Sequence, residues 1–276
     1  MSRIRATFAA LKQRGEKGLI TFLTAGDPDL ATSEQVVHCL VEAGVDLIEL
    51  GIPFSDPMAD GPTIQAASER ALAAGATLCG VLELVSRVRQ HSNVPIVLMG
   101  YYNPVLQYGP DAFAAAAARA GVDGLLLVDL PPEEAAELQP ALRVHGIDLI
   151  TLLAPTTDAH RREQLAKSAE GFLYYVSMTG VTGSQRVDAD AIAASVEELR
   201  QVSPVPVAVG FGVTTADDAR QIAGFADAVV VGSALVRLIA EHAGSDRLYD
   251  EVKLFATALK KATCHGEETV HGSSCR

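Results

Sequence analysis

Short apolar segments alternate along the chain with longer segments in which apolar residues recur at helical spacing. The apolar segments are continuous rather than alternating, which is typical of parallel strands buried on both faces. Eight of them occur, at residues 19–23, 47–50, 95–99, 124–128, 147–153, 172–176, 205–209 and 226–231. Helical patterns lie between them, for example at residues 30–43, 111–120, 132–144, 189–202 and 214–222. Several begin after Ser, Thr, Asp or Pro, which favour the first turn of a helix.

Eight strand–helix units predict an α/β fold of the (β/α)8 TIM barrel type, and an open doubly wound sheet is the less favoured alternative. An extra N-terminal helix is expected over residues 2–13, before the first strand. Two segments interrupt the simple repeat: residues 52–90, and residues 177–190, which are rich in Gly, Thr and Ser. We expect one barrel domain over residues 1–262 and a disordered polar tail over residues 263–276.

Composition narrows the range of functions. The chain has 276 residues, and a barrel of this type needs roughly 250. Trp is absent and aromatic residues make up 5%, so the core should be aliphatic. The formal net charge of -12 argues against nucleic-acid binding, which requires a basic surface. A phosphorylated small molecule remains compatible, because backbone N–H groups can bind phosphate without Lys or Arg.

The sequence also predicts where the protein resides. No apolar run is long enough to span a membrane, and no apolar signal core follows the first residues. We therefore expect a cytoplasmic protein. The cysteines show no metal-ligand spacing and are expected to be reduced thiols. They are Cys39, Cys79, Cys264 and Cys275.

Barrel enzymes place their active sites at the carboxyl ends of the strands, so polar residues there are candidates for chemistry. Glu49 interrupts the second apolar run, and a buried unpaired carboxylate is either a shifted acid–base group or part of a structural pair. The loop that follows contains Asp56 and Asp60 among three prolines. Either aspartate could be a second catalytic carboxylate, and both could equally be turn residues.

The seventh and eighth strands end in glycine-rich turns, Gly210–Gly212 and Gly232–Ser233, each leading into a helix. This is the usual phosphate-binding place of such barrels, where the alternative is that the glycines only serve tight turns. The segment after the sixth strand, residues 179–184, suits a lid over the phosphate.

Some chemistries have no residues to support them. No lysine ends a predicted strand, which argues against a Schiff-base aldolase. No histidines pair at metal-ligand spacing on a strand end, so no metal site is expected. Acid–base chemistry by carboxylates, without a cofactor, is the remaining interpretation.

The stretch from Glu49 to Gln65, ELGIPFSDPMADGPTIQ, resembles the α subunit of tryptophan synthase. The resemblance includes residues 23–28, 180–183, 210–212 and 232–234, and it runs from residue 3 to residue 262. It implies cleavage of indole-3-glycerol phosphate to indole and glyceraldehyde 3-phosphate by a carbon–carbon lyase of tryptophan biosynthesis.

The resemblance also implies roles for individual residues. Glu49 would be the general acid–base, and Asp60 would hold the indole N–H. Tyr174 matches an active-site tyrosine, and Thr182 matches a lid threonine. The other implied substrate contacts are the indole-pocket residues Phe22 and Tyr101 and the phosphate-site residues Gly183, Gly212, Gly232 and Ser233.

A partner is implied as well, namely a pyridoxal-phosphate β subunit that receives indole in an α2β2 heterotetramer. The contact would involve Pro53, Asp56 and Pro57, and this chain itself would bind no pyridoxal phosphate. Three alternatives remain. They are another phosphate-binding barrel, such as a sugar-phosphate epimerase or phosphoribosyl isomerase, a stand-alone indole-3-glycerol phosphate lyase, and a non-catalytic regulatory subunit. The segment from Glu49 to Asp60 argues against the first, because those isomerases place their catalytic groups differently.

Overall fold

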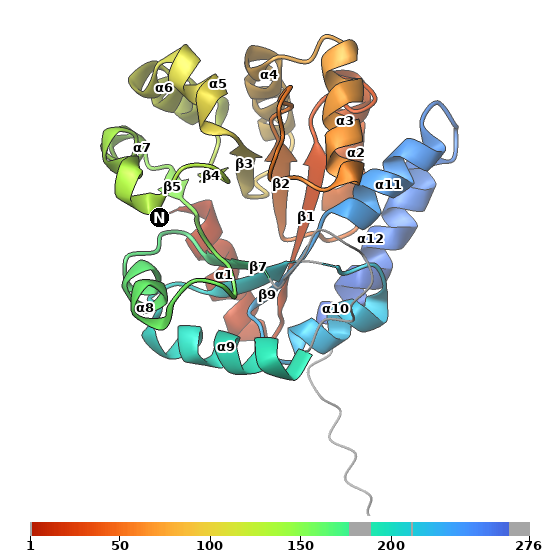
Figure 1. Ribbon diagram of the computed structural model, residues 1–276. Coiled ribbons are helices and arrows are strands. Elements are labelled where there is room, and N and C mark those ends of the chain that lie inside the picture. Colours follow the sequence, from red (N-terminus) through yellow and green to blue (C-terminus); the bar gives the residue numbers. More distant parts are fainter. Residues whose placement is uncertain (1, 177–188, 211, 265–276) are drawn as a thin grey trace, which may run out of the picture.

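The computed structural model describes residues 2–176, 189–210 and 212–264. In these residues nine strands, all paired in parallel, form one sheet in the order β5-β4-β3-β2-β1-β9-β8-β7-β6. The strands at the two ends of this order, β5 and β6, are separated along the chain by Ile150 alone. The sheet is therefore a nearly closed barrel, surrounded by helices (Figure 1). The predicted (β/α)8 TIM barrel is confirmed.

The strands are β1 Gly18–Thr24, β2 Leu47–Gly51, β3 Ile96–Gly100, β4 Gly124–Leu127, β5 Asp148–Leu149, β6 Thr151–Leu153, β7 Leu173–Val176, β8 Val207–Gly210 and β9 Ala228–Val231. The predicted fifth strand is thus divided into β5 and β6. Ile150, between them, still donates its backbone N–H to the carbonyl oxygen of Leu125 over 2.8 Å. The break leaves the eight-unit pattern of the barrel intact.

The described helices are α1 Arg3–Arg14, α2 Leu30–Glu42, α3 Pro62–Ala73, α4 Leu78–Arg89, α5 Tyr102–Tyr108, α6 Pro110–Ala120, α7 Gln139–Val144, α8 Ala159–Lys167, α9 Ala189–Val202, α10 Ala216–Ala223, α11 Ser233–His242 and α12 Leu248–Cys264. A 3₁₀ helix, η1, spans Pro132–Glu137. The helix predicted over residues 132–144 is therefore two short helices. Pro140 explains the break, since it lacks an N–H group and its ring clashes with the preceding turn.

Successive residues of a strand point to opposite faces, and β2 shows the consequence. Leu47 belongs to the cluster inside the barrel, with Ile20 and Val97. Ile48 and Leu50 belong to the cluster between the strands and the surrounding helices. Glu49 therefore points inward, on the same face as Leu47.

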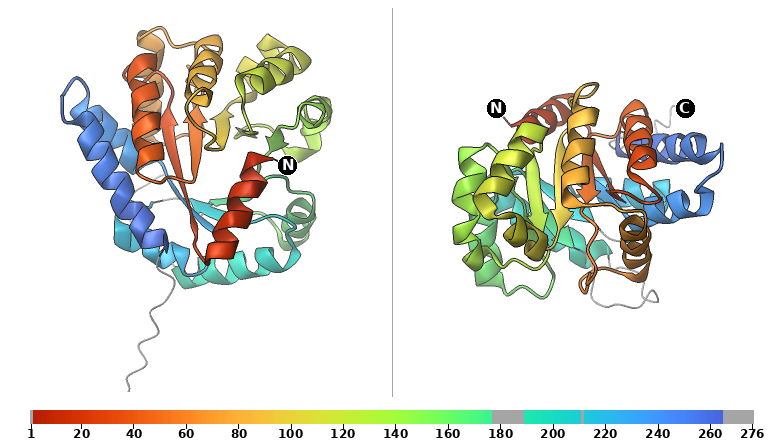
Figure 2. Two further views of the ribbon diagram at one scale, coloured as in Figure 1. Left: turned by 180° about the vertical axis from the view of Figure 1, so that it is seen from behind. Right: turned by 90° about the horizontal axis from the view of Figure 1, so that it is seen from above.

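The extra N-terminal helix, α1, lies across one end of the barrel (Figure 2, left). Its residues Ile4, Phe8 and Leu11 join the inner cluster. They lie at the amino ends of the strands, because Leu11 and Ile4 contact the places of Gly18 and Gly124, the first residues of β1 and β4. Each such buried side chain contributes about 1.5–3 kcal/mol. The amino end is thus filled with apolar side chains, and the carboxyl ends remain for chemistry.

The last helix extends further than expected, because Thr263 and Cys264 belong to α12 and not to the predicted tail. The carbonyl oxygen of Thr263 accepts the backbone N–H of Lys17 over 3.1 Å, which ties this end to the start of β1. Residues 265–276, including Cys275, lie outside the described residues. Cys39, Cys79 and Cys264 are free thiols.

Among the described helices, none alone has the length and apolar character needed to cross a membrane. Within the same described residues, α3 and α4 taken together, as a pair bent by 95°, meet such a test by length and composition alone.

Candidate active site

Glu49 lies inside the barrel on β2, where it is fully buried. Neither of its carboxylate oxygens has a hydrogen-bond partner among the described residues. Its neighbours in the sheet are Phe22 of β1 and Val97 of β3. Burial disfavours the charged form and raises the pKa of Glu49 from 4.5 to about 8. The group therefore holds its proton at neutral pH and can donate it.

Tyr174 of β7 also points into the barrel, where it is partly buried and packs against the inner cluster. Burial, and secondarily the charge of Glu49, raise the pKa of Tyr174 well above its usual value. Its hydroxyl lies beside Gly210, so close that a Cβ atom at Gly210 would be only 2.4 Å from it. The structure thus brings Tyr174 near Glu49, and Gly210 makes the room for it.

Asp60 and Tyr101 form a second polar group in the site. The Tyr101 hydroxyl donates to Oδ2 of Asp60 over 3.2 Å and accepts the backbone N–H of Ala59 over 2.9 Å. Burial raises the pKa of Asp60, and the hydrogen bond from Tyr101 acts in the opposite direction. The Tyr101 ring stacks on Phe54 with 5.1 Å between the ring centroids. This contact fixes the ring that positions Asp60.

Asp60 and Tyr101 line a narrow pocket at the carboxyl ends of β1, β2 and β3. Its lining consists of Phe22, Thr24, Gly51, Ile52, Asp60, Ile64, Ser68, Met99, Gly100, Tyr101 and Val128. The pocket encloses about 10 Å³, which is about the space of one water molecule. A larger ligand must therefore displace lining side chains.

Sequence reasoning missed several of these lining residues. Thr24 is buried at the end of β1, and its hydroxyl has no hydrogen-bond partner among the described residues. The rule that polar strand-end residues are candidates would have identified it. Ser68, Met99 and Val128 carry no comparable signal, because nothing in the sequence separates them from ordinary core positions.

The predicted phosphate-site residues described here lie at the carboxyl ends of β8 and β9, two paired strands. Gly212 follows β8 with φ of 70°, a backbone conformation that favours glycine. Gly232 is the N-cap of α11, and Ser233, which is exposed, is the first residue of that helix. Free backbone N–H groups at such a helix start bind anions. Thr182 and Gly183 lie outside the described residues.

The three predicted partner-contact residues differ in exposure. Asp56 is exposed and Pro57 is partly exposed, whereas Pro53 is buried within the chain. Their neighbour Met58 is the most exposed large apolar side chain of the described residues, at 87%. The outer part of this loop is therefore accessible to a partner.

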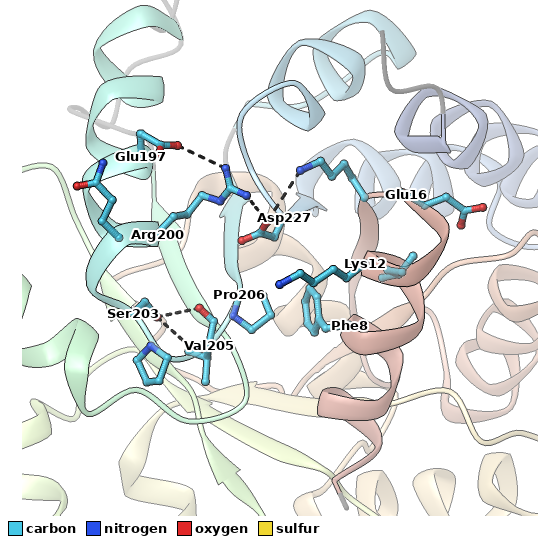
Figure 3. A pocket seen from close by; sticks show the side chains of 14 residues that line it. Phe8, Lys12, Glu16, Glu197, Arg200, Ser203, Val205, Pro206 and Asp227 are labelled. Atoms are coloured by element: carbon cyan, nitrogen blue, oxygen red, sulfur yellow. Dashed lines mark hydrogen bonds and ion pairs between the residues drawn. The ribbon is translucent and has the colours of Figure 1, made fainter.

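A larger hollow of about 540 Å³ lies at the other end of the barrel, between α1, the end of α9 and the start of β8 (Figure 3). Its acids are already paired with cations: Arg200 bonds Asp227 over 3.1 Å and Glu197 over 3.4 Å. Glu16 bonds Arg14 over 3.0 Å. None of the predicted site residues lines this hollow, and it offers no counterpart to Glu49.

Comparisons with known proteins identify the family of the chain. The family described as "Tryptophan synthase alpha chain" matches residues 8–264. The tryptophan synthase alpha chains of Citrifermentans bemidjiense and Geobacter sulfurreducens are 57% and 55% identical, over 96% and 95% of this chain and 99% of each relative.

A crystal structure of tryptophan synthase subunit alpha from Legionella pneumophila superposes with a TM-score of 0.88 at 41% identity, covering 95% of this chain and 98% of that one. Tryptophan synthase from Mycobacterium tuberculosis gives a TM-score of 0.88 at 37% identity, covering 96% and 100%. A family match over nearly the whole chain, at this identity, is decisive: the chain belongs to the tryptophan synthase α chain family.

Proposed function

We propose that Glu49 is the general acid–base, and Asp60 the second catalytic carboxylate, of the lyase reaction of this chain. That reaction is the retro-aldol cleavage of indole-3-glycerol phosphate to indole and glyceraldehyde 3-phosphate, a step of tryptophan biosynthesis. The observation that carries the proposal is the Glu49 carboxyl group, which is buried without a partner on the inner face of β2. Such a group is a proton donor at neutral pH.

The reaction requires a place for the electrons of the bond that breaks. Glu49 donates its proton to the ring carbon that carries the side chain, which makes the ring a cationic indolenine. The electrons of the carbon–carbon bond then neutralise this cation. The Glu49 carboxylate takes the proton of the adjacent side-chain hydroxyl, which becomes the aldehyde, so Glu49 ends in its starting state. The protonated ring is the electron sink, and the step needs no Schiff base.

Asp60 accepts the ring N–H and stabilises the positive charge of the indolenine. The hydrogen bond from Tyr101, 3.2 Å long, supports this role because it orients the carboxylate before substrate arrives. Tyr174 stays a neutral hydroxyl beside Glu49, because its pKa is raised well above its usual value. Phe22 and Tyr101 supply the flat apolar walls of the indole pocket, which must widen to admit the ring.

The phosphate of the substrate binds at the turns after β8 and β9. Gly212, Gly232 and Ser233 are suited to this by their adjacent strands and by the start of α11. Thr182 and Gly183 are proposed to contribute from residues 177–190, as a lid.

The chain also docks on a β subunit that carries pyridoxal phosphate, in a cytoplasmic α2β2 complex, and itself needs no cofactor. The exposed Asp56 and Met58 support a contact through this loop. Pro57 lies within the same surface, and Pro53 acts from beneath it by fixing the loop.

The test is cleavage of indole-3-glycerol phosphate by the purified chain, followed through glyceraldehyde 3-phosphate, with and without a tryptophan synthase β subunit. Slow cleavage that the β subunit strongly accelerates is the expected result. Fast cleavage without it would instead indicate a stand-alone lyase. Absence of cleavage in both cases would leave a regulatory subunit or an isomerase.

A further inference from the structure

We infer that Gln65 is a positioning residue, which holds the loop of Asp60 through two hydrogen bonds to backbone carbonyl oxygens. Its side-chain Nε2 donates to the carbonyl oxygen of Asp60 over 2.9 Å and to that of Pro57 over 3.3 Å. The catalytic consequence rests on the proposed role of Asp60, whereas the mechanical consequence does not.

The loop has little else to hold it in place. Met58, Ala59 and Gly61 are all exposed, so residues 57–61 bury little apolar surface. Within the loop, the Asp60 N–H donates to the Pro57 carbonyl oxygen over 3.0 Å. Among the described residues, Tyr101 and Gln65 provide the side-chain hydrogen bonds that reach residues 57–60 from outside. Tyr101 bonds the Asp60 carboxylate and the Ala59 N–H, whereas Gln65 bonds the backbone carbonyl oxygens of Pro57 and Asp60.

Gln65 is itself held in place by helix α3. It lies in the first turn of α3, where its backbone N–H donates to the Gly61 carbonyl oxygen over 3.0 Å. Further along α3, Ala67 and Ala71 are fully buried. Arg70 makes two 2.7 Å hydrogen bonds to the Asp27 carboxylate after β1. Because α3 is fixed to the barrel, the Gln65 amide transmits that fixed position to the loop.

Only a neutral donor of this length suits the position. The Gln amide has two N–H donors, one for each of the two carbonyl oxygens. A Glu side chain of the same shape has no donor when ionised and would face both carbonyl oxygens with negative charge. A Met side chain has the length but no donor. Loss of both bonds lets Asp60 shift, and a displacement of about 1 Å can reduce a rate by up to 100-fold.

The test uses Gln65→Glu and Gln65→Met, with Gln35→Glu and Gln35→Met as matched controls on the exposed side of α2. Amide hydrogen exchange of Ala59 and Asp60 should become about tenfold faster in both Gln65 variants. The kcat for indole-3-glycerol phosphate should fall about tenfold or more, with the Kd of glycerol 3-phosphate within about twofold of the parent. The controls should match the parent protein.

Unchanged exchange at Ala59 and Asp60 in the Gln65 variants would overturn the inference, whatever the activity. An unchanged kcat with a raised Kd of glycerol 3-phosphate would also overturn it, because that pattern indicates general loosening of the barrel. Faster exchange in a chain whose parent shows no lyase activity would support the positioning role and reject the proposed function.

Discussion

Glu49 is the residue to which we assign the acid–base chemistry, because its buried carboxyl group has no hydrogen-bond partner among the described residues. An ordinary structural carboxylate is paired, as Asp27 is with Arg70. The sequence showed an acid inside an apolar run, but it left open whether a buried donor would satisfy it. Among the described residues no donor pairs with Glu49, so a purely structural ion pair or hydrogen bond does not explain the buried acid. A catalytic role is the simpler explanation.

We expect Glu49→Gln to abolish cleavage of indole-3-glycerol phosphate while leaving the Kd of glycerol 3-phosphate nearly unchanged. The amide keeps the shape of the side chain but can neither donate an acidic proton nor accept one. Steady-state assays and a binding titration measure the two quantities, with Glu69→Gln, an exposed change of equal charge on α3, as the control. Turnover retained by Glu49→Gln would reject Glu49 as the acid–base.

The same residue makes stability depend on pH. The pKa of Glu49 is about 8 in the folded chain and near 4.5 when exposed, so the folded state binds a proton that the unfolded state releases. The stabilisation that comes from this extra bound proton is fully present below pH 4.5 and is lost as the pH rises to about 8. Glu49→Gln should therefore raise the free energy of unfolding at pH 9 by more than about 1 kcal/mol, and by much less at pH 5. Urea unfolding at both pH values measures this, and an equal change at the two would contradict the raised pKa.

At the scale of elements, α3 connects the end of β1 with the Asp60 loop. The connection depends on the two hydrogen bonds between Arg70 and Asp27, whose side chain is only 3% exposed. Arg70 is 40% exposed, so solvent weakens the attraction between the charges. The hydrogen bonds still matter, since they satisfy a buried carboxylate.

Arg70→Met should lower the free energy of unfolding by about 2 kcal/mol, because Asp27 is left buried without its partner. Arg220→Met is the control, since Arg220 pairs with Asp217 on the exposed surface of α10 and should change stability by less than about 0.5 kcal/mol. Denaturant unfolding compares the two. Equal effects would mean that the Asp27 pair is no stronger than a surface pair.

The barrel could be predicted from sequence because its strands are continuous apolar runs. These runs alternate with helical segments, and the alternation occurs eight times along the chain. Details that depend on tertiary contacts could not. The division at Ile150 and the extension of α12 through Thr263, whose carbonyl oxygen accepts the Lys17 N–H, are such details. The break at Pro140, by contrast, follows from the proline itself and could have been predicted. The site shows the same limit: Glu49 and Asp60 stand out in a linear sequence, whereas Gln65 matters only through two carbonyl oxygens that folding places beside it.

At the scale of the whole molecule, the nearly closed barrel places the groups that stabilise the fold and the groups proposed for the chemistry at opposite ends. Helix α1 covers the amino end. Its Phe8 packs in the inner cluster, with 6.0 Å between the ring centroids of Phe8 and Phe172. The carboxyl end holds Glu49, Asp60 and the narrow pocket. Between them lies the layer of inward-facing residues that includes Leu47. A change at the amino end should therefore alter folding energy without altering the reacting groups.

Phe8→Ala tests this separation. The substitution removes a side chain that packs in the inner cluster and also borders the hollow at the amino end, and it should lower the free energy of unfolding by about 3–5 kcal/mol. The kcat for indole-3-glycerol phosphate, measured where the variant is fully folded, should stay within about twofold of the parent. Leu254→Ala, which removes a 68% exposed side chain on α12, should change neither quantity appreciably. If kcat in Phe8→Ala fell as far as in the Gln65 variants, the two ends of the barrel would have to be mechanically coupled through the inner layer.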